Sequence, residues 1–483
     1  MNRLKAFTVI EIILAMGLFT IVVGAAVGVV IQAFSTNRLS EEESYANGRA
    51  SEGIEAARAI ATQDFFNLVN GSYGLTTQDG RWEFSGSSET LGKFTRRIII
   101  SNVFRDAQGN IVSTEGSLDL FTKRVESLVN WDFSPGRSNS VSLKTYFTFW
   151  EAPICEWEDA SSLNQVGGLN LPGPAGGTDI AVDDNVGYAT GIKNSQGQEF
   201  FVLSLADPVN PQVAASVEIN FDVNAVWVSD SFAYLATSKP DQELMVFNVS
   251  DPNSPVLVGG NGAAGADALD VTAENSYAYL GLRNNSGPEF YIYNVAIPSN
   301  PTLLGTFEVG KDVSAISVKN DRAYLAVTST GQTDAKSLLV LDVSDPAASF
   351  ELGSYQTELA GAKGLSVFYA GGIVHLTTAA NAGSVPEYYL LDASDPTNIN
   401  LLGSLDAQHA INSVETGTGF ALLATDTNAK AVMIVDIAPP TTPTEIFSLP
   451  LGGSGIGTAI NGCYAYVSST DNNQEIKVVA PPQ

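Results

Sequence analysis

The hydrophobic pattern begins with one long apolar run. It extends from Phe7 to about Phe34, and the stretch Ile12–Ile31 is twenty residues without a charge. A helix of this length spans a bilayer. Residues 37–69 are rich in Ala, Glu and Arg, and their apolar residues recur at helical spacing. We predict a single helix over residues 7–66, about 90 Å long, with a bend at Asn47–Gly48.

The middle of the chain alternates apolar and polar residues with the period of β-strands. The strand-like runs are Trp82–Ser85, Phe94–Phe104, Lys123–Phe133 and Val141–Trp150. Turns rich in Gly, Asn and Asp separate them. A long helix followed by an antiparallel β-meander predicts an α+β unit with its β head over residues 67–152. Residues 153–160 are expected to form a linker.

The last part of the chain repeats. The marker of each unit is an apolar or aromatic residue in its second strand: Tyr188, Tyr234, Tyr279, Tyr324, His375, Leu422 and Tyr466. Successive markers are 44 to 51 residues apart. A period of this length with four short strands is typical of a β-propeller, so residues 161–483 predict an all-β, seven-bladed propeller.

The seventh unit is incomplete at the end of the chain. It supplies three strands, and the segment "SSLNQVGGLNLPG" at 161–173 resembles the missing fourth strand. We therefore predict that the first strand of the propeller completes the last blade. Such closure protects sheet edges that would otherwise remain open.

The two cysteines flank this closure. Cys155 precedes the strand that would become the fourth of the last blade, and Cys463 begins the second. In an antiparallel blade these positions lie at the same end, so we predict a Cys155–Cys463 disulfide in an oxidising exterior. Two unrelated buried thiols are the alternative.

The charge and the scarcity of metal-ligating residues exclude several functions. Net charge is −28, from 24 Lys and Arg against 52 Asp and Glu, which argues against a nucleic-acid partner. Two cysteines and two histidines are too few for an ordinary Cys/His zinc site. No phosphate loop, nucleophile elbow or metal-spaced triad is found. We expect no enzyme activity and no cofactor.

One row of acidic residues allows two interpretations. Asp222, Asp267 and Asp312 each stand twelve residues before a marker tyrosine, at the start of the innermost strand. Three carboxylates on one side of the channel mouth would attract a cation, or each would cap a turn. The sequence leaves open whether any metal ion is bound.

The N-terminus contains an unusual charge. The leader "MNRLKA" places Arg3 and Lys5 before the apolar run, which holds the N-terminus in the cytoplasm, and no signal-peptidase site follows the run. A plain signal anchor would satisfy these features. However, Glu11 lies inside the apolar run, where a carboxylate is costly unless it is paired.

The segment "KAFTVIEIILAMGLFTIVVG" resembles the class III leader of type IV pilins and pseudopilins. The resemblance implies that residues 1–6 are a leader, that a prepilin peptidase cuts between Ala6 and Phe7, and that the new amine of Phe7 is methylated. Ala6 stands where the family usually has Gly. Glu11 would then neutralise the amine of an adjacent subunit, and this pairing would set the register of assembly.

The repeats carry a second resemblance. Third strands such as "LMVFNVSDP" and "LLVLDVSDP" end in a Ser-Asp-Pro turn, in which Pro fixes φ and Asp bonds the backbone two residues on. These units resemble LVIVD repeats, a family of propeller-forming repeats found in surface proteins.

Together the resemblances imply a structural subunit of a type IV pilus-like filament that displays a propeller for adhesion or partner binding. The expected partners are other pilin subunits, the prepilin peptidase, the cytoplasmic membrane before assembly, and an extracellular ligand or surface. The bulk of the propeller favours a minor or tip subunit. The alternatives are a pseudopilin of a type II secretion system and a membrane-tethered propeller enzyme.

Overall fold

The computed structural model describes most of the chain. The described residues are 9–63, 65–78, 80–105, 111–112, 117–134, 136–148, 157, 163–173, 176–183, 185–195, 197–262, 265–328, 336–357, 362–380, 383, 385–417 and 419–481. Two compact units are present. The helix–sheet unit comprises Met1–Ser101 and Lys123–Phe147, and the propeller unit comprises Asn102–Thr122 and Thr148–Gln483.

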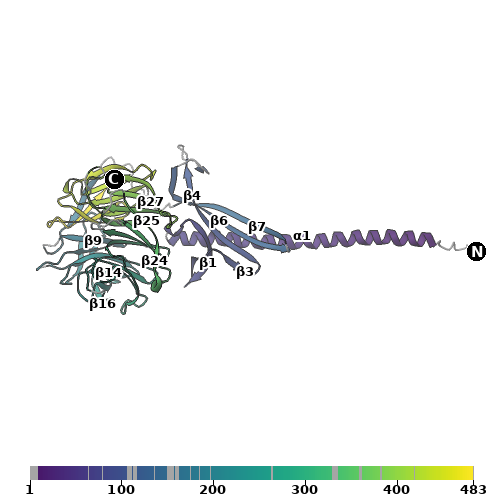
Figure 1. The fold of residues 1–483 in the computed structure, drawn as a ribbon, viewed down its shortest axis with the longest axis horizontal. Coiled ribbons are helices and arrows are strands. Elements are labelled where there is room, and N and C mark those ends of the chain that lie inside the picture. The colour runs from purple at the N-terminus through teal and green to yellow at the C-terminus, as the bar shows by residue number, and fades with distance from the viewer. Residues whose placement is uncertain are drawn as a thin grey trace, which may run out of the picture. The chain divides into compact units, whose positions relative to one another are not determined.

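The helix–sheet unit begins with one long helix. Helix α1 runs from Val9 to Gln63, and a short 3₁₀ helix, Phe65–Asn67, follows it (Figure 1). The helix continues through Asn47 and Gly48 without interruption, although we had expected a bend there. Phe7, the expected first residue, lies outside the described residues.

The sheet that follows has seven strands. They are β1 (Gly71–Gln78), β2 (Arg81–Ser85), β3 (Glu89–Leu91), β4 (Phe94–Arg105), β5 (Ile111–Val112), β6 (Ser117–Ser134) and β7 (Arg137–Thr148). Their order is β2-β1-β4-β6-β7, with β3 and β5 also paired to β4. The four predicted runs correspond to β2, β4, β6 and β7. Strand β1 was missed because its glycines and polar residues hide the alternation.

The second half of α1 packs on this sheet. Ala46 and Ala50 join Phe94, Val129 and Trp131 in one core cluster. The buried Arg96 guanidinium crosses the interface: it pairs with Glu89 at 2.6 Å and Glu52 at 3.1 Å, and donates to the carbonyl oxygen of Arg49 at 2.9 Å. Small residues on the helix and paired charges on the sheet therefore hold the two layers together.

The propeller consists of seven four-stranded sheets (Figure 1). Blades one to three are β9 (Gly177–Asp183), β10 (Val186–Gly191), β11 (Phe200–Ser204), β12 (Gln212–Val217); β13 (Val223–Ser229), β14 (Phe232–Thr237), β15 (Leu244–Asn248), β16 (Val256–Asn261); and β17 (Ala268–Glu274), β18 (Tyr277–Leu282), β19 (Phe290–Asn294), β20 (Thr302–Phe307). Blades four and five are β21 (Asp312–Lys319), β22 (Arg322–Thr328), β23 (Leu338–Asp342), β24 (Phe350–Tyr355); and β25 (Gly364–Ala370), β26 (Ile373–Thr378), β27 (Tyr388–Asp392), β28 (Asn400–Leu405). Blade six is β29 (Ile411–Thr416), β30 (Phe420–Thr425), β31 (Val432–Asp436), β32 (Thr444–Leu449).

Blade seven closes the ring. It contains β33 (Gly455–Asn461), β34 (Tyr464–Ser469), β35 (Ile476–Ala480) and, as its fourth strand, β8 (Asn164–Leu169). Strand β8 pairs antiparallel with β35, with Ile476 opposite Leu169. The predicted closure is confirmed, and so is the fold class of a long N-terminal helix followed by a seven-bladed propeller.

Neighbouring blades meet through glycines of the fourth strand. A Cβ on any of five such glycines would overlap a carbonyl oxygen in a turn of the next blade; they are Gly167, Gly259, Gly305, Gly353 and Gly403. The turn residue is a proline in four cases and Val209 for Gly167. In these five blades the fourth-strand glycine is therefore a packing requirement between neighbouring blades.

The marker residues are core residues. Their exposed fractions are 5% or less in all seven blades. His375 takes the tyrosine position in blade five, and its Nδ1 lies 2.7 Å from the hydroxyl oxygen of Tyr388. Burial lowers the pKa of His375 to about 3, so this histidine is neutral and packs in the core.

Two glycines of α1 provide a matched test of the helix–sheet packing. A Cβ on Gly53 would overlap Ser127 Oγ and lie 2.9 Å from Ile98 Cδ1, whereas a Cβ on Gly48 meets nothing within 4 Å. Gly53→Ala should destabilise the helix–sheet unit by about 1–3 kcal/mol. Gly48→Ala should stabilise it by up to about 1 kcal/mol through helix propensity. Calorimetry of the detergent-solubilised chain measures both, and equal effects would contradict close contact at Gly53.

Candidate functional site

The first half of α1 presents apolar side chains without covering. From Val9 to Phe34 its large hydrophobic residues are exposed, Val9 by 75% and Phe34 by 71%. Among the described residues, α1 is the one helix long and apolar enough to cross a membrane, by length and composition alone. Glu11 is the single charged residue between positions 9 and 34, and it lies in the first turn. Ala6 and Phe7 fall outside the described residues.

Three glycines lie on one face of this apolar half. Gly17, Gly24 and Gly28 are spaced i, i+7 and i+11, and a Cβ on each would meet nothing within 4 Å. Gly24 and Gly28 form a small-xxx-small pair, which allows helices to approach closely in lipid. We did not read this signal, "GAAVG", from the sequence.

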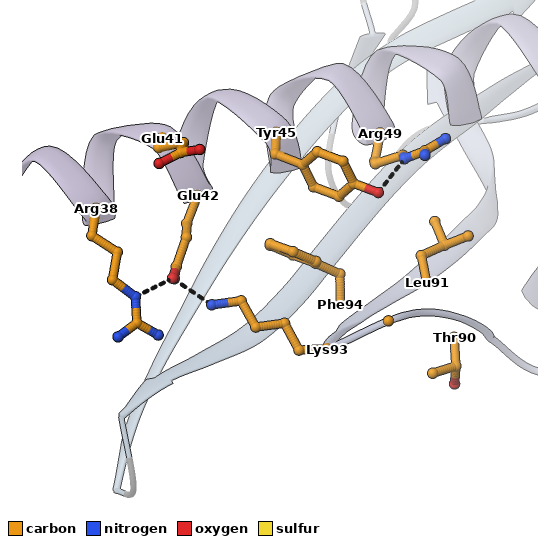
Figure 2. Close-up of a pocket in the computed structure, with 10 residues that line it drawn as sticks. Arg38, Glu41, Glu42, Tyr45, Arg49, Thr90, Leu91, Lys93 and Phe94 are labelled. Carbon is orange, nitrogen blue, oxygen red and sulfur yellow. Dashed lines mark hydrogen bonds and ion pairs between the residues drawn. The ribbon is translucent and has the colours of Figure 1, made fainter.

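A groove runs along the second half of α1 (Figure 2). It has a volume of about 890 Å³ and lies between one stripe of the helix and the turn joining β3 to β4. The helix contributes Arg38, Glu41, Glu42, Tyr45 and Arg49, and the β3–β4 hairpin contributes Thr90, Leu91, Gly92, Lys93 and Phe94.

Glu42 organises one end of the groove. Its carboxylate accepts from Arg38 Nε at 2.9 Å, pairs with Lys93 Nζ at 2.5 Å and accepts from Trp131 Nε1 at 2.9 Å. Figure 2 shows Arg38 and Lys93 reaching Glu42 from opposite sides. One carboxylate thus connects the helix, the turn and the sheet.

Aromatic rings form the middle of the groove. Tyr45 and Phe94 have ring centroids 4.8 Å apart, and Phe94 lies 5.4 Å from Trp131. At the far end, Arg49 Nε donates to the Tyr45 hydroxyl at 3.0 Å (Figure 2). The groove is therefore an aromatic surface with cationic groups at both ends.

The propeller holds three carboxyl groups on its innermost strands, which we call the inner-strand carboxyls: Asp179, Asp270 and Glu415. Each accepts a hydrogen bond from a backbone N–H of the next innermost strand: from Val226 at 2.9 Å, Ile316 at 2.6 Å and Ile460 at 2.9 Å, respectively. They connect neighbouring blades at the centre of the ring.

The inner-strand carboxyls titrate at raised pH. Part of each side chain stays accessible, but the surrounding blades desolvate the carboxyl group. Burial raises the pKa of Asp179 to about 6. Burial, with the Asp179 charge added, raises the pKa of Asp270 to about 7 and that of Glu415 to about 8. Near pH 6, a large part of these three carboxyl groups is therefore protonated and uncharged.

The predicted acidic row at the channel mouth has other partners. Asp222 Oδ1 accepts from the Lys193 backbone N–H at 2.8 Å, and Asp312 Oδ1 accepts from the Asn284 N–H at 2.8 Å, each across to the preceding blade. Asp267 pairs with Arg283 at 2.9 Å. In the described part of the chain, no three His, Cys, Asp or Glu residues gather to hold a metal ion.

A second row of acids was missed in the sequence. A buried glutamate directly precedes the third strand in five blades: Glu199, Glu243, Glu289, Glu387 and Glu475. Glu289 Oε2 accepts from the backbone N–H groups of Val309 and Gly310 at 2.9 and 2.8 Å. Burial raises the pKa of Glu289 and Glu475. The signal was a glutamate at a fixed position of the repeat.

The turns explain many of the remaining acids. Asp251 and Asp395 in the Ser-Asp-Pro turns accept from backbone N–H groups two residues on, both at 3.0 Å. Asp342 and Asp392, at the ends of third strands, do the same, also at 3.0 Å. The repeated acids thus stabilise turns.

The structure describes one of the two cysteines of the predicted disulfide. Cys463 is disulfide-bonded, and it directly precedes β34. Cys155 lies outside the described residues, so its pairing with Cys463 stays a prediction. Within the expected linker, Trp157 is described: it is 2% exposed, and its ring is 5.3 Å from that of Phe420.

The comparisons with known proteins agree with the propeller. The LVIVD repeat model matches residues 222–260, 310–357 and 425–449, which lie in blades two, four and six. This protein therefore contains a propeller domain with LVIVD repeats. No curated protein matches the chain.

Solved structures show the same fold. A chain in the crystal structure of the mitotic checkpoint complex has a TM-score of 0.50 and 11% identity, covering 69% of this chain and 97% of that chain. The Cps50 (Swd1) β-propeller domain of Myceliophteria thermophila has a TM-score of 0.49 and 10% identity, covering 66% of this chain and 99% of that chain. At 11% identity, the likeness to the chain in the mitotic checkpoint complex shows the fold alone.

The inner-strand carboxyls predict a pH dependence of stability. Their folded pKa values exceed the unfolded values near 4, so the unfolded state releases protons first as pH rises. Propeller stability should therefore fall between about pH 4 and pH 8. The variant Asp179→Asn, Asp270→Asn, Glu415→Gln should raise the melting temperature at pH 8 by on the order of 5 °C, with a smaller change at pH 4. The exposed Asp207→Asn is the control, and a pH-independent difference would refute the assignment.

The disulfide predicts a dependence on redox conditions. Cys463→Ser should lower the melting temperature of the propeller, because removing a disulfide costs about 2–5 kcal/mol. Reductant should lower the wild type to the same value and leave the variant unchanged. Non-reducing peptide mapping should recover one cross-linked peptide with Cys155 and Cys463. Two alkylatable thiols in the oxidised chain would contradict the pairing.

Proposed function

We propose that this chain is a subunit of a type IV pilus-like surface filament. It is inserted in the cytoplasmic membrane through the apolar half of α1, with the N-terminus inside. It then polymerises through the same helix and carries its propeller outside the cell. The role is structural rather than catalytic, and the propeller offers a rigid surface for adhesion or partner binding.

Glu11 is the observation that carries this proposal. A carboxylate in a 26-residue apolar segment is unfavourable in lipid unless an opposite charge meets it. Cleavage by a prepilin peptidase between Ala6 and Phe7 creates such a charge, the amine of Phe7. Glu11 stands four positions after Phe7, and in our proposal the pair forms between two adjacent subunits displaced along their axes by that distance.

The glycine face supports close helix packing. Gly17, Gly24 and Gly28 lower helix propensity. A Cβ on any of them would meet nothing within 4 Å, so no contact among the described residues requires glycine there. Small residues on one face let the helices of neighbouring subunits approach in an apolar environment. One face of the second half of α1 packs on its own sheet, whereas the described side chains of the first half have no such covering.

The propeller suits display outside the cell. Strand β8 closes its ring and pairs with β35, so β35 is not left as an open edge that could pair with another chain. Cys463 is disulfide-bonded, which fits an oxidising compartment. The charge of −28 favours solubility and disfavours a nucleic-acid partner.

Mass spectrometry of filaments sheared from cells tests the proposal. The chain should begin at methylated Phe7 and be present among the other pilin subunits, and its abundance tells a minor from a main subunit. A chain that remains in the membrane fraction with Met1 or Arg3 attached would refute the proposal.

A substitution of Glu11 tests the mechanism. Glu11→Gln should leave membrane insertion and cleavage intact and lower the amount in filaments at least about tenfold, because the amine of the neighbour loses its partner. Glu55→Gln, on the exposed second half of the same helix, is the matched control and should assemble normally. Normal assembly of Glu11→Gln would show that the carboxylate is not an assembly contact.

A further inference from the structure

We propose that the groove of the helix–sheet unit receives helix α1 of an adjacent copy of this chain, with Glu41 of that copy between Lys93 and Arg49. The inference rests on the proposed function, since it describes how subunits of the filament meet beyond the membrane-embedded half. Two neighbouring copies are enough for the contact, so it holds for a minor subunit as well.

The shape of the groove fits a helix lying alongside α1. Its helical wall is formed by residues 38, 41, 42, 45 and 49, at i, i+3, i+4, i+7 and i+11. The groove therefore follows the helix axis for about 16 Å, which is three turns. The opposite wall is the turn between β3 and β4, and Tyr45 and Phe94 form an aromatic surface between the walls (Figure 2).

The groove places cations at defined positions. Lys93 is held by Glu42 and its side chain is still 40% exposed. Arg49 is held by Glu52 at 2.7 Å and its side chain is 35% exposed. Because their own partners fix both side chains, Lys93 and Arg49 lose little conformational entropy when a further carboxylate binds between them.

The chain carries a complementary surface on the adjoining side of the same helix, and Glu41 lies at the edge that this surface shares with the groove. Asn37, Glu41, Ser44 and Gly48 are exposed and lie at i, i+4, i+7 and i+11. This face has one acid and otherwise small polar residues, and Gly48 has open space in place of a side chain. A groove and a different complementary face on one molecule form a heterologous contact, which builds an open helical filament.

The register of the N-terminal pair brings the two surfaces together. If the amine of residue 7 in one copy meets Glu11 of the next, the parallel helices are displaced by four residues, about 6 Å. Glu41 of the first copy then lies level with Tyr45 of the second. That level is about 4.5 Å along the axis from Glu42, which holds Lys93, and about 6 Å from Arg49. Long side chains reach across both separations.

Photo-crosslinking in cells tests the contact. Tyr45 of the full chain is replaced by p-benzoylphenylalanine, this variant is co-expressed with a tagged wild-type copy, and filaments are sheared after irradiation. Trypsin cuts after Arg38 and Arg49, so we expect crosslinks to the wild-type peptide Leu39–Arg49, which its Tyr45 distinguishes by mass. Filaments that contain the chain but yield crosslinks only to lipid, to another envelope protein or to none of these would overturn the inference and leave the proposed function standing.

A pair of charge reversals gives an independent readout. Glu41→Lys should lower the amount of the chain in filaments at least about tenfold, since like charges then face each other across the contact. Glu43→Lys makes the same change two residues further on, on a different side of the helix, and should assemble as the wild type does. Equal behaviour of the two variants would overturn the inference. Absence of the wild-type chain from all filaments would overturn the proposed function together with it.

Discussion

The pairing of β8 with β35 is the constraint on which the propeller depends. Without it, the outer edge of the last blade would be open, and β8 would be a lone strand with nothing to pair. Because β8 comes first and β35 last, the ring forms only after the whole propeller sequence is available. The disulfide-bonded Cys463 lies in the same blade, and the predicted pairing with Cys155 would close a loop over the whole propeller.

Neighbouring blades contact each other through their fourth strands and through the inner-strand carboxyls. The fourth-strand glycines let backbone touch backbone, so the rim is closely packed. At the centre, the inner-strand carboxyls accept hydrogen bonds from the neighbouring strand, although burial opposes their ionisation. The ring therefore gains blade-to-blade specificity at some cost in stability above neutral pH.

The two halves of helix α1 differ in what covers them. Its second half is completed by its own sheet, with Arg96 and Glu42 satisfied across the interface. Its first half keeps exposed apolar side chains, one carboxylate and a glycine face. The exposed apolar side chains and the glycine face are unfavourable for an isolated soluble helix and become favourable in a membrane or a bundle of helices, where the carboxylate needs an opposite charge.

The sequence by itself determined the long helix, the seven units, the marker core and the exchange of β8 into the last blade. Hydrophobic periodicity and repeat spacing are patterns along the chain, so they can be recognised in the sequence alone. Strand β1, the groove, the inner-strand carboxyls and the partners of Asp222 and Asp312 were decided only by the tertiary structure. Each depends on residues distant in the chain: the sequence allows Asp222 to bind a cation or to cap a turn, and the structure shows that it accepts a hydrogen bond from the Lys193 N–H of the preceding blade.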